Sequence, residues 1–283
     1  MVNIHEAGPF EGRLEQWPVL TTAGSLEVRL AETEAEVEAA QRLRYRVFYE
    51  EMAAIPTFEM REQRRDFDHF DDVCDHMLVV DREVLDDDGQ PVVVGTYRLM
   101  RDEYAARVGG FYAAGEYDIA PMLARLSKDY RLLELGRSCI VKAYRTKPAT
   151  MQLLWRGVMT YVARFSIDLL FGCASLAGTE PNALALPLSY LHHFCPMPPD
   201  IRVRARPELY VEMDRMPKDA IDPKEALRGL PPMIKGYVRA GANIGAGAVI
   251  DRQFATTDVF IYLPLSKMDA RYKSRFGKAA GLT

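Results

Sequence analysis

The sequence contains no long hydrophobic run. No stretch of about 18 or more uncharged apolar residues occurs, so we expect no membrane-spanning helix. The N-terminal stretch MVNIHEAGPFEGRLEQWPVL carries early acids and lacks the continuous apolar core of a secretory signal. We therefore expect a cytoplasmic protein.

Cysteine is scarce, and no CxxC pair occurs. The spacing predicts free thiols packed as small hydrophobes; the four positions are Cys74, Cys139, Cys173 and Cys195. LHHFC (191–195) suggests a metal site, but we expect its two histidines to point in different directions, and no second ligand cluster appears. DFDHFDD (66–72) lacks the Gly and terminal Glu of a calcium loop, so we expect no metal.

The chain also lacks an excess of positive charge. Its net charge of -4 argues against a nucleic-acid partner. The C-terminal end departs from this balance, with Asp269 as the only acid among the cations Lys267, Arg271, Lys273, Arg275 and Lys278. This segment is either a solvated tail or a weak contact for an acidic partner or an anionic membrane surface. If it is a membrane contact, neutralising its last three cations should weaken binding to anionic vesicles.

The 283 residues divide into an arm over 1–25, one domain over 26–266 and a basic tail over 267–283. Periodicity predicts a strand over 26–31 and a helix that Thr33 and Glu36 cap, followed by a polar loop. Asp88-Gly89 joins two strands as a hairpin. Further strands are predicted over 132–141, 169–178, 201–213 and 254–265, with helices over 148–167 and 182–194. This order is that of the GNAT acyltransferase fold, an α/β domain with a mixed central sheet flanked by helices.

Two charges interrupt the apolar strand LLELGRSCIV (132–141). Glu134 and Arg137 are three residues apart, so in a regular strand their side chains would point to opposite faces. Gly136 between them is where a bulge can bring both to one side. A bulged central strand that splays from its neighbour opens a cleft, and a buried carboxylate there is either a base or half of a structural ion pair. We expect Arg137 to steady Glu134.

Other charges fall in apolar or compact segments. Arg44 lies in the first helix with Phe48 one turn later, Arg98 lies in an otherwise apolar strand, and an acidic loop holds Asp68 and Asp71. Carboxylates can receive a cationic substrate and accept its proton, and guanidiniums bind a substrate carboxylate by paired hydrogen bonds. We expect these side chains to surround one substrate cleft.

The segments LRYRVF, DHFDD, GTYRLM and ELGRSCI resemble the ordered signature R-x-x-V-F, D-x-x-D, G-x-x-R, E-x-x-R of the acyl-homoserine-lactone synthases. ELGRSC with LAGTEP, and above all LPPMIKGYVRAGANIGAGAVIDRQFATTDVFI, resemble a sister family more closely. That family is the ornithine N-acyltransferases of bacterial ornithine-lipid synthesis. The resemblance runs from about residue 26 to 265. It implies a GNAT fold and transfer of an acyl chain from acyl carrier protein.

Carried over by position, the resemblance implies Glu134 as the base and places Arg44, Asp68 and Asp71 around the amino-acid and acyl-carrier side of the cleft. Arg98 and Arg137 would hold the cleft together or bind the substrate carboxylate. The Trp that follows the first helix in the lactone synthases is missing, which argues against an adenosylmethionine site and favours an ordinary amino acid. Asp68 and Asp71 are compatible with the second ammonium of a diamino acid. We give a covalent acyl-Cys139 little weight, since no His lies near it in sequence.

The donor follows from a missing motif. CoA-dependent GNAT enzymes carry a Gly-rich loop after this strand that cradles the pyrophosphate, and here KAYRTKPATMQ contains no glycine. Lys142, Arg145 and Lys147 would instead meet the single phosphodiester of 4′-phosphopantetheine or the acidic side chains of a carrier protein. AGANIGAGAVI (240–250) lacks the context of a dinucleotide fingerprint and reads as a tight loop beside the acyl channel.

The hypothesis is therefore an N-acyltransferase without a further cofactor. It moves a 3-hydroxyacyl chain from acyl carrier protein to the α-amine of L-ornithine, forming lyso-ornithine lipid at the inner membrane surface. The alternatives are another acceptor such as glycine, glutamine or lysine, a homoserine-lactone synthase, and a non-catalytic acyl-carrier or lipid-binding protein.

Overall fold

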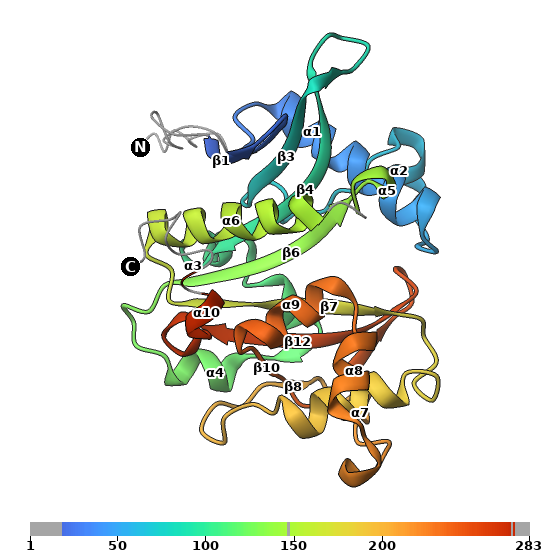
Figure 1. Cartoon of the computed structure of the whole chain (residues 1–283), viewed down its shortest axis with the longest axis vertical. Coiled ribbons are helices and arrows are strands. Elements are labelled where there is room, and N and C mark those ends of the chain that lie inside the picture. The colour runs from blue at the N-terminus through green and yellow to red at the C-terminus, as the bar shows by residue number, and fades with distance from the viewer. Residues whose placement is uncertain (1–18, 146–147, 273, 275–283) are drawn as a thin grey trace, which may run out of the picture.

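The computed structural model describes residues 19–145, 148–272 and 274 (Figure 1). The strands are β1 (Val19–Ala23), β2 (Leu26–Leu30), β3 (Asp75–Leu85), β4 (Pro91–Arg101), β5 (Tyr117–Asp118), β6 (Leu132–Ile140), β7 (Leu169–Ala177), β8 (Arg204–Ala205), β9 (Tyr210–Val211), β10 (Asn243–Ile244), β11 (Ala248–Asp251) and β12 (Thr256–Pro264). The α-helices are α1 (Glu34–Tyr45), α2 (Phe58–Gln63), α3 (Asp102–Ala105), α4 (Ala120–Arg125), α5 (Lys142–Arg145), α6 (Pro148–Phe165), α7 (Ala185–Phe194), α8 (Pro223–Gly229), α9 (Pro232–Ala240) and α10 (Ala270–Tyr272). A π-helical segment, η1 (Arg46–Glu51), follows α1, and 3-10 turns are η2 (Ala106–Val108), η3 (Tyr112–Gly115), η4 (Lys218–Ala220) and η5 (Leu265–Lys267).

One large mixed sheet forms the centre of the molecule. Its strand order is β1-β2-β3-β4-β6-β7-β12-β11-β9, with β10 paired to β12. β6 and β7 are parallel, and their ladder ends at the Glu134–Phe171 pair although both strands continue, to Ile140 and Ala177. The two strands therefore splay, as the sequence predicted.

Helices cover both faces of the sheet. α6 crosses one face and α1 lies behind the other, while α9 lies over β12 (Figure 1). The Thr33 side chain accepts a hydrogen bond from the Glu36 N–H and the Glu36 carboxylate accepts from the Thr33 N–H, which confirms the predicted capping box of α1. α6 packs closely on β2 because Gly157 has no side chain; a Cβ there would lie 2.5 Å from Val28.

Several boundaries differ from the predictions. Residues 19–23, which were assigned to the arm, form β1 and pair with β2. The helix predicted from Thr33 changes to a π-helix at Arg46, and the predicted polar loop contains α2. The strand predicted over 201–213 is reduced to β8 and β9, on either side of Pro207. Proline cannot donate to a ladder, which explains the interruption.

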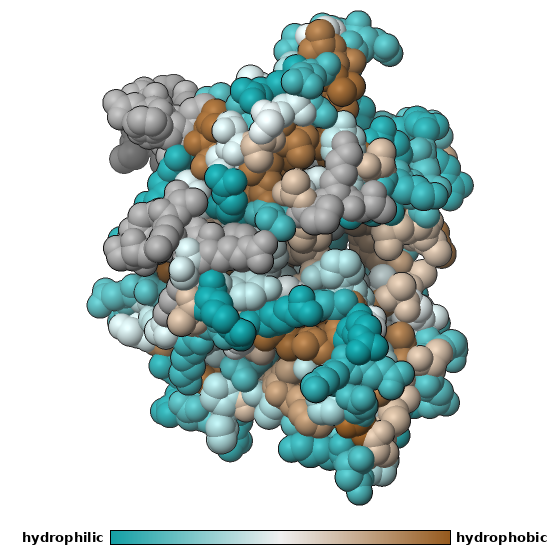
Figure 2. Space-filling view, in the orientation of Figure 1, coloured by the Kyte–Doolittle hydropathy of each residue, from teal (hydrophilic) through white to brown (hydrophobic). Residues whose placement is uncertain are grey.

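The β3–β4 hairpin projects from the body of the protein. Gly89 at its turn has a φ of 73°. This is the positive φ that the Asp88-Gly89 hairpin signal predicts. The strand ends beside this turn expose Val84 and Leu85, which form the apolar patch at the tip in Figure 2. Residues 267–272 of the predicted tail are described and include α10, whereas Lys273, Arg275 and Lys278 lie outside the described residues.

Candidate active site

A cavity of about 630 Å³ occupies the splay between β6 and β7. Its walls come from the unpaired ends of these two strands, from β12, from η1 and from the N-terminal end of α9. Gly172 on β7 is required there, because its φ is 148° and a Cβ would lie 2.4 Å from the Leu135 carbonyl oxygen. The position of the cavity shows that the splay opens an internal space beside the bulge of β6.

β6 bulges at the residues that the sequence singled out. The register with β4 shifts between the Arg98–Gly136 pair and the Thr96–Cys139 pair. Arg137 lies in the bulge with a φ of 53°, a left-handed conformation that non-glycine residues seldom adopt. The bulge is thus confirmed, and it brings Glu134 and Arg137 to the same cavity.

Glu134 is a buried carboxylate that lines the cavity. Its Oε2 accepts a hydrogen bond of 2.8 Å from the Tyr112 N–H, and its Oε1 accepts one of 2.7 Å from the Ala113 N–H. Burial raises the pKa of Glu134 to about 7, and the two backbone donors only partly oppose this shift. The group can therefore exist in both protonation states near neutral pH, while it also anchors η3.

A buried network of arginines and aspartates lies beside the cavity. The Arg44 side chain has no exposed surface; its Nε donates to Asp66 at 2.7 Å and its Nη2 donates to Asp71 at 2.8 Å. Burial would raise the pKa of Asp71, but the guanidiniums of Arg44 and Arg98 outweigh burial and hold this pKa below its usual range. Asp66 is a member that the sequence analysis missed, although it lies two residues before Asp68 in the same acidic run.

The network continues through Asp68. Arg98 donates to its Oδ1 at 2.6 Å and Arg137 donates to its Oδ2 at 3.1 Å. The Arg137 guanidinium also lies over the rings of Tyr112 and Phe254, at 4.9 and 4.7 Å from their centroids. Arg137 therefore binds Asp68, and Tyr112 is the residue that contacts both Arg137 and Glu134, so the expected steadying of Glu134 by Arg137 stays a prediction.

The predicted site residues separate into two groups. Five line the cavity, namely Phe48, Arg98, Glu134, Arg137 and Arg145. Arg44, Asp68 and Asp71 stand behind this wall and neutralise one another. Since guanidiniums already occupy the Asp68 and Asp71 carboxylates, the suggestion that these two receive a second ammonium is not supported by the geometry.

One arm of the cavity is apolar. Phe48 meets Phe254 edge to face at 5.4 Å, and the wall continues through α6 and α9; its apolar side chains include Val47, Met52, Met151, Met233 and Ile234. Tyr97 and Tyr237 add a polar pair to this arm, and their hydroxyl oxygens are 2.5 Å apart. An arm of this kind suits an alkyl chain that carries one hydroxyl group.

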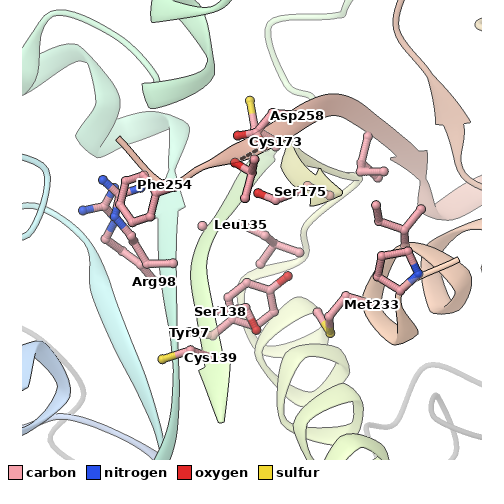
Figure 3. A pocket seen from close by; sticks show the side chains of 18 of the residues that line it. Tyr97, Arg98, Leu135, Ser138, Cys139, Cys173, Ser175, Met233, Phe254 and Asp258 are labelled. Carbon is pink, nitrogen blue, oxygen red and sulfur yellow. Dashed lines mark hydrogen bonds between the residues drawn. The ribbon is translucent and has the colours of Figure 1, made fainter. Parts of the chain in front are cut away.

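A second region of the cavity, its acidic end, carries carboxylates. Asp251 and Asp258 line it, and Figure 3 shows Asp258 beside Cys173 and Ser175, away from Tyr97 and Met233. One carboxylate oxygen from each of Asp251, Asp258 and Glu116 lies within 4.8 Å of the others. The sequence analysis missed these three residues, although Asp258 is a charge within the apolar strand TTDVFIYLP, the same signal that drew attention to Glu134.

Two of the basic residues expected to meet the donor, Lys142 and Arg145, lie near the end of β6. Arg145 donates to the Ile140 carbonyl oxygen at 2.6 Å and pairs with Glu51, so its charge is partly occupied. Lys142 is exposed on α5, and Lys147 lies outside the described residues. Cys139 lines the cavity as a buried thiol, and burial raises its pKa, which disfavours a thiolate nucleophile.

We had expected the two histidines of LHHFC to point in different directions. In the structure both side chains approach the same carboxylate. The Nε2 atoms of His192 and His193 lie 4.0 and 2.9 Å from carboxylate oxygens of Asp214. His193 also approaches the Met216 carbonyl oxygen at 3.0 Å. The group is partly exposed and none of its residues lines the cavity, and exposed groups of this composition are common without a metal.

The fold and the site together define a GNAT acyltransferase. The model of the GNAT acetyltransferase domain matches residues 43–156. The chain belongs to the family of the L-ornithine N(alpha)-acyltransferases. It is 53% identical to the L-ornithine N(alpha)-acyltransferase of Brucella abortus over 93% of this chain and 92% of that protein, and 49% identical to that of Rhizobium meliloti over 93% and 88%.

Among solved structures, the acyl-homoserine-lactone synthase LasI matches with a TM-score of 0.47 and 13% identity, over 89% of this chain and 95% of that chain. Among the described residues, no helix is both long and apolar enough to cross a membrane.

Proposed function

We propose that this acyltransferase moves a 3-hydroxyacyl chain from acyl carrier protein to the α-amine of L-ornithine, forming lyso-ornithine lipid. The observation that carries the proposal is one cavity that joins an apolar arm, a buried carboxylate with a pKa of about 7 and an acidic end. The names of the relatives, at 41–53% identity, support ornithine as the acceptor.

Glu134 is the proposed base. An α-ammonium has a reference pKa near ~8, so a carboxylate whose own pKa is close to 7 can accept its proton at a modest energetic cost. The free amine then attacks the thioester carbonyl, the C–N bond forms and the C–S bond breaks, and the carrier's thiolate leaves and takes up the proton that the nitrogen loses. Backbone N–H groups of β6 beyond the last pair with β7 are the proposed donors to the oxyanion.

Arg98 and Arg137 are the proposed partners of the substrate carboxylate. Both line the cavity, and their charges are held in place by Asp68 rather than by solvent. Arg44 and Asp71 lie one layer further from the cavity. Their proposed role is to fix Arg98 and the bulge of β6, and Phe48 is proposed to contact the acyl chain beside the thioester.

The proposed donor is acyl carrier protein. The segment after β6 has no glycine with which to wrap a pyrophosphate, whereas Lys142 on α5 is exposed beside it. We assign Lys142, Arg145 and Lys147 to contact with the carrier or its phosphodiester. The product is an amphiphile, so we also propose a cytoplasmic enzyme that touches the inner membrane surface weakly. Ile55 and Phe58, 62% and 78% exposed beside the η1 wall of the cavity, support this contact.

The test is mass-spectrometric product detection with purified protein, 3-hydroxyacyl carrier protein and a panel of free amino acids, with acyl-CoA in parallel. We expect N-acyl-ornithine from the carrier-bound donor and a loss of at least about a hundredfold in Glu134→Gln. Product from acyl-CoA at an equal rate would refute the donor assignment. No product with any acceptor would refute the enzymatic proposal and leave a lipid-binding role.

A further inference from the structure

Three carboxylates at the acidic end of the cavity come from separate elements. Glu116 follows η3, Asp251 ends β11, and Asp258 lies on β12, where it is 5% exposed. One oxygen of each lies within 4.8 Å of the other two. Asp251 and Asp258 also line the cavity, so the group faces the space that the substrate would enter.

Like charges this close are costly unless a cation or protons neutralise them. Burial and the neighbouring carboxylates raise the pKa values of both Glu116 and Asp258. The Thr256 hydroxyl donates to Asp258 at 2.9 Å, but a hydroxyl brings no charge. Arg137 is the basic group that acts on both carboxylates, and its guanidinium is engaged by Asp68.

A second observation indicates a missing partner. The Oε2 atom of Glu116 is enclosed and has no hydrogen-bond partner among the described residues, and the side-chain donor to this carboxyl group is the neutral Cys173 thiol. A buried carboxylate oxygen without a donor is unfavourable, so a donor from a ligand is the expected complement. An ammonium group brings three N–H donors and one positive charge, which match three converging acceptors.

The proposed base and the acidic end lie along one stretch of β7. Cys173 on β7 lies two residues from Phe171, which pairs with Glu134, and two residues from Ser175, which pairs with Asp258. Burial and the charges of Glu116, Asp258 and Glu134 all raise the pKa of the Cys173 thiol, so this residue lies between the proposed base and the acidic end. The two nitrogens of extended ornithine are about 6 Å apart, from five bonds of standard length.

We propose that Glu116, Asp251 and Asp258 bind the side-chain ammonium of the acceptor and thereby select a basic diamino acid. This inference rests on the proposed function, since it assumes that an amino acid is acylated in this cavity. In this arrangement the side chain of the acceptor is selected at the β7–β12 side of the splay, and the α-amine lies at Glu134.

The test compares L-ornithine with L-norvaline, which has the same carbon chain without the ammonium, in the acyl-carrier assay. Variants are Asp258→Asn, Asp251→Asn and Glu116→Gln, and Asp219→Asn on the exposed turn η4 is the matched control. We expect wild type to favour ornithine in kcat/KM, and Asp258→Asn to reduce that preference about ten- to a hundredfold through the loss of one charged hydrogen bond. In the Asp219→Asn control, turnover of both amino acids should stay within about twofold of wild type. Because the substitutions relieve repulsion, the variants should retain the wild-type melting temperature.

The outcomes separate this inference from the proposed function. If wild type acylates ornithine and norvaline equally, or if the variants keep the preference of wild type, the acidic end does not read the ammonium, although the acyltransferase stands. If wild type neither acylates nor binds ornithine by calorimetry, the proposed function fails and this inference with it. Three carboxylates also suit a divalent cation. Stabilisation of wild type by Ca²⁺ or Mg²⁺ that the variants lose, with the ornithine preference intact, would overturn the assignment.

Discussion

The buried Arg44 should dominate the stability of the region behind the cavity. Its side chain donates four hydrogen bonds, to the carboxylates of Asp66 and Asp71 and to the Asp66 carbonyl oxygen, and it has no exposed surface. Arg44→Met removes one positive charge and leaves two buried carboxylates without their main partner. Breaking a buried ion pair in this way costs about 3–5 kcal/mol. For a chain of this length, we expect a fall of about 5–8 °C in the melting temperature.

The matched control is Arg42→Met on the same helix. Arg42 is 53% exposed and pairs with Glu38 four residues earlier, so its loss should change stability by less than about 0.5 kcal/mol. Thermal unfolding of both variants by circular dichroism at pH 7 checks the difference. Equal melting temperatures for the two variants would refute the view that the Arg44 network is a buried structural element.

The effect of Arg44 should also depend on pH with a defined sign. The network depresses the pKa values of Asp66 and Asp71, against burial, so their ionised forms stabilise the fold above the ordinary carboxyl pKa of 3.8. That stabilisation is lost as the pH falls through the depressed pKa values of the folded protein. The gap in melting temperature between wild type and Arg44→Met should therefore be largest near neutral pH and shrink below pH 3.8. A gap that widens in acid would contradict this assignment.

Three further predictions concern the cavity. If Glu134 is the base, kcat/KM should fall about tenfold per pH unit below about 7, and Glu134→Gln should remove this acidic limb in a stopped-assay pH profile; an unchanged limb would move the base elsewhere. Tyr237→Phe should reduce the preference for 3-hydroxyacyl over plain acyl donors by about tenfold, because it removes one hydroxyl of the buried pair with Tyr97. An unaltered ratio of the rates with the two donors would show that this pair does not bind the 3-hydroxyl group. Gly172→Ala should lower the melting temperature and abolish acyl transfer, because the new Cβ would press on the Leu135 carbonyl oxygen. The control Gly115→Ala, where a Cβ meets nothing within 4 Å, should be tolerated. Equal melting temperatures and activities of the two variants would argue against a close approach of β6 and β7 at the splay.

Local signals were sufficient to predict the centre of the site. Charges inside the apolar β6 and a glycine between them indicated a bulge, and the structure has that bulge with Arg137 in a left-handed conformation. The Thr33 cap and the Asp88-Gly89 turn were equally local and equally clear. Such features depend on a few adjacent residues, so the sequence contains most of the information that specifies them.

Partnerships between distant segments could not be predicted in the same way. The sequence placed Asp68 and Asp71 near the cleft, but it did not show that three arginines from α1, β4 and β6 neutralise them. The acidic end joins Glu116 to two residues more than a hundred positions later, which requires knowledge that β12 lies beside β7. β1 was missed because its short pattern depends on pairing with β2.

The regiochemistry of the product tests the central claim most directly. If the side-chain ammonium is held by Glu116, Asp251 and Asp258, only the α-nitrogen can reach the thioester beside Glu134. Tandem mass spectrometry of the product from L-ornithine and 3-hydroxyacyl carrier protein distinguishes the two possible amides. We predict acylation at the α-nitrogen alone. Acylation at the δ-nitrogen, or a mixture of both amides, would contradict the arrangement of the cavity described above.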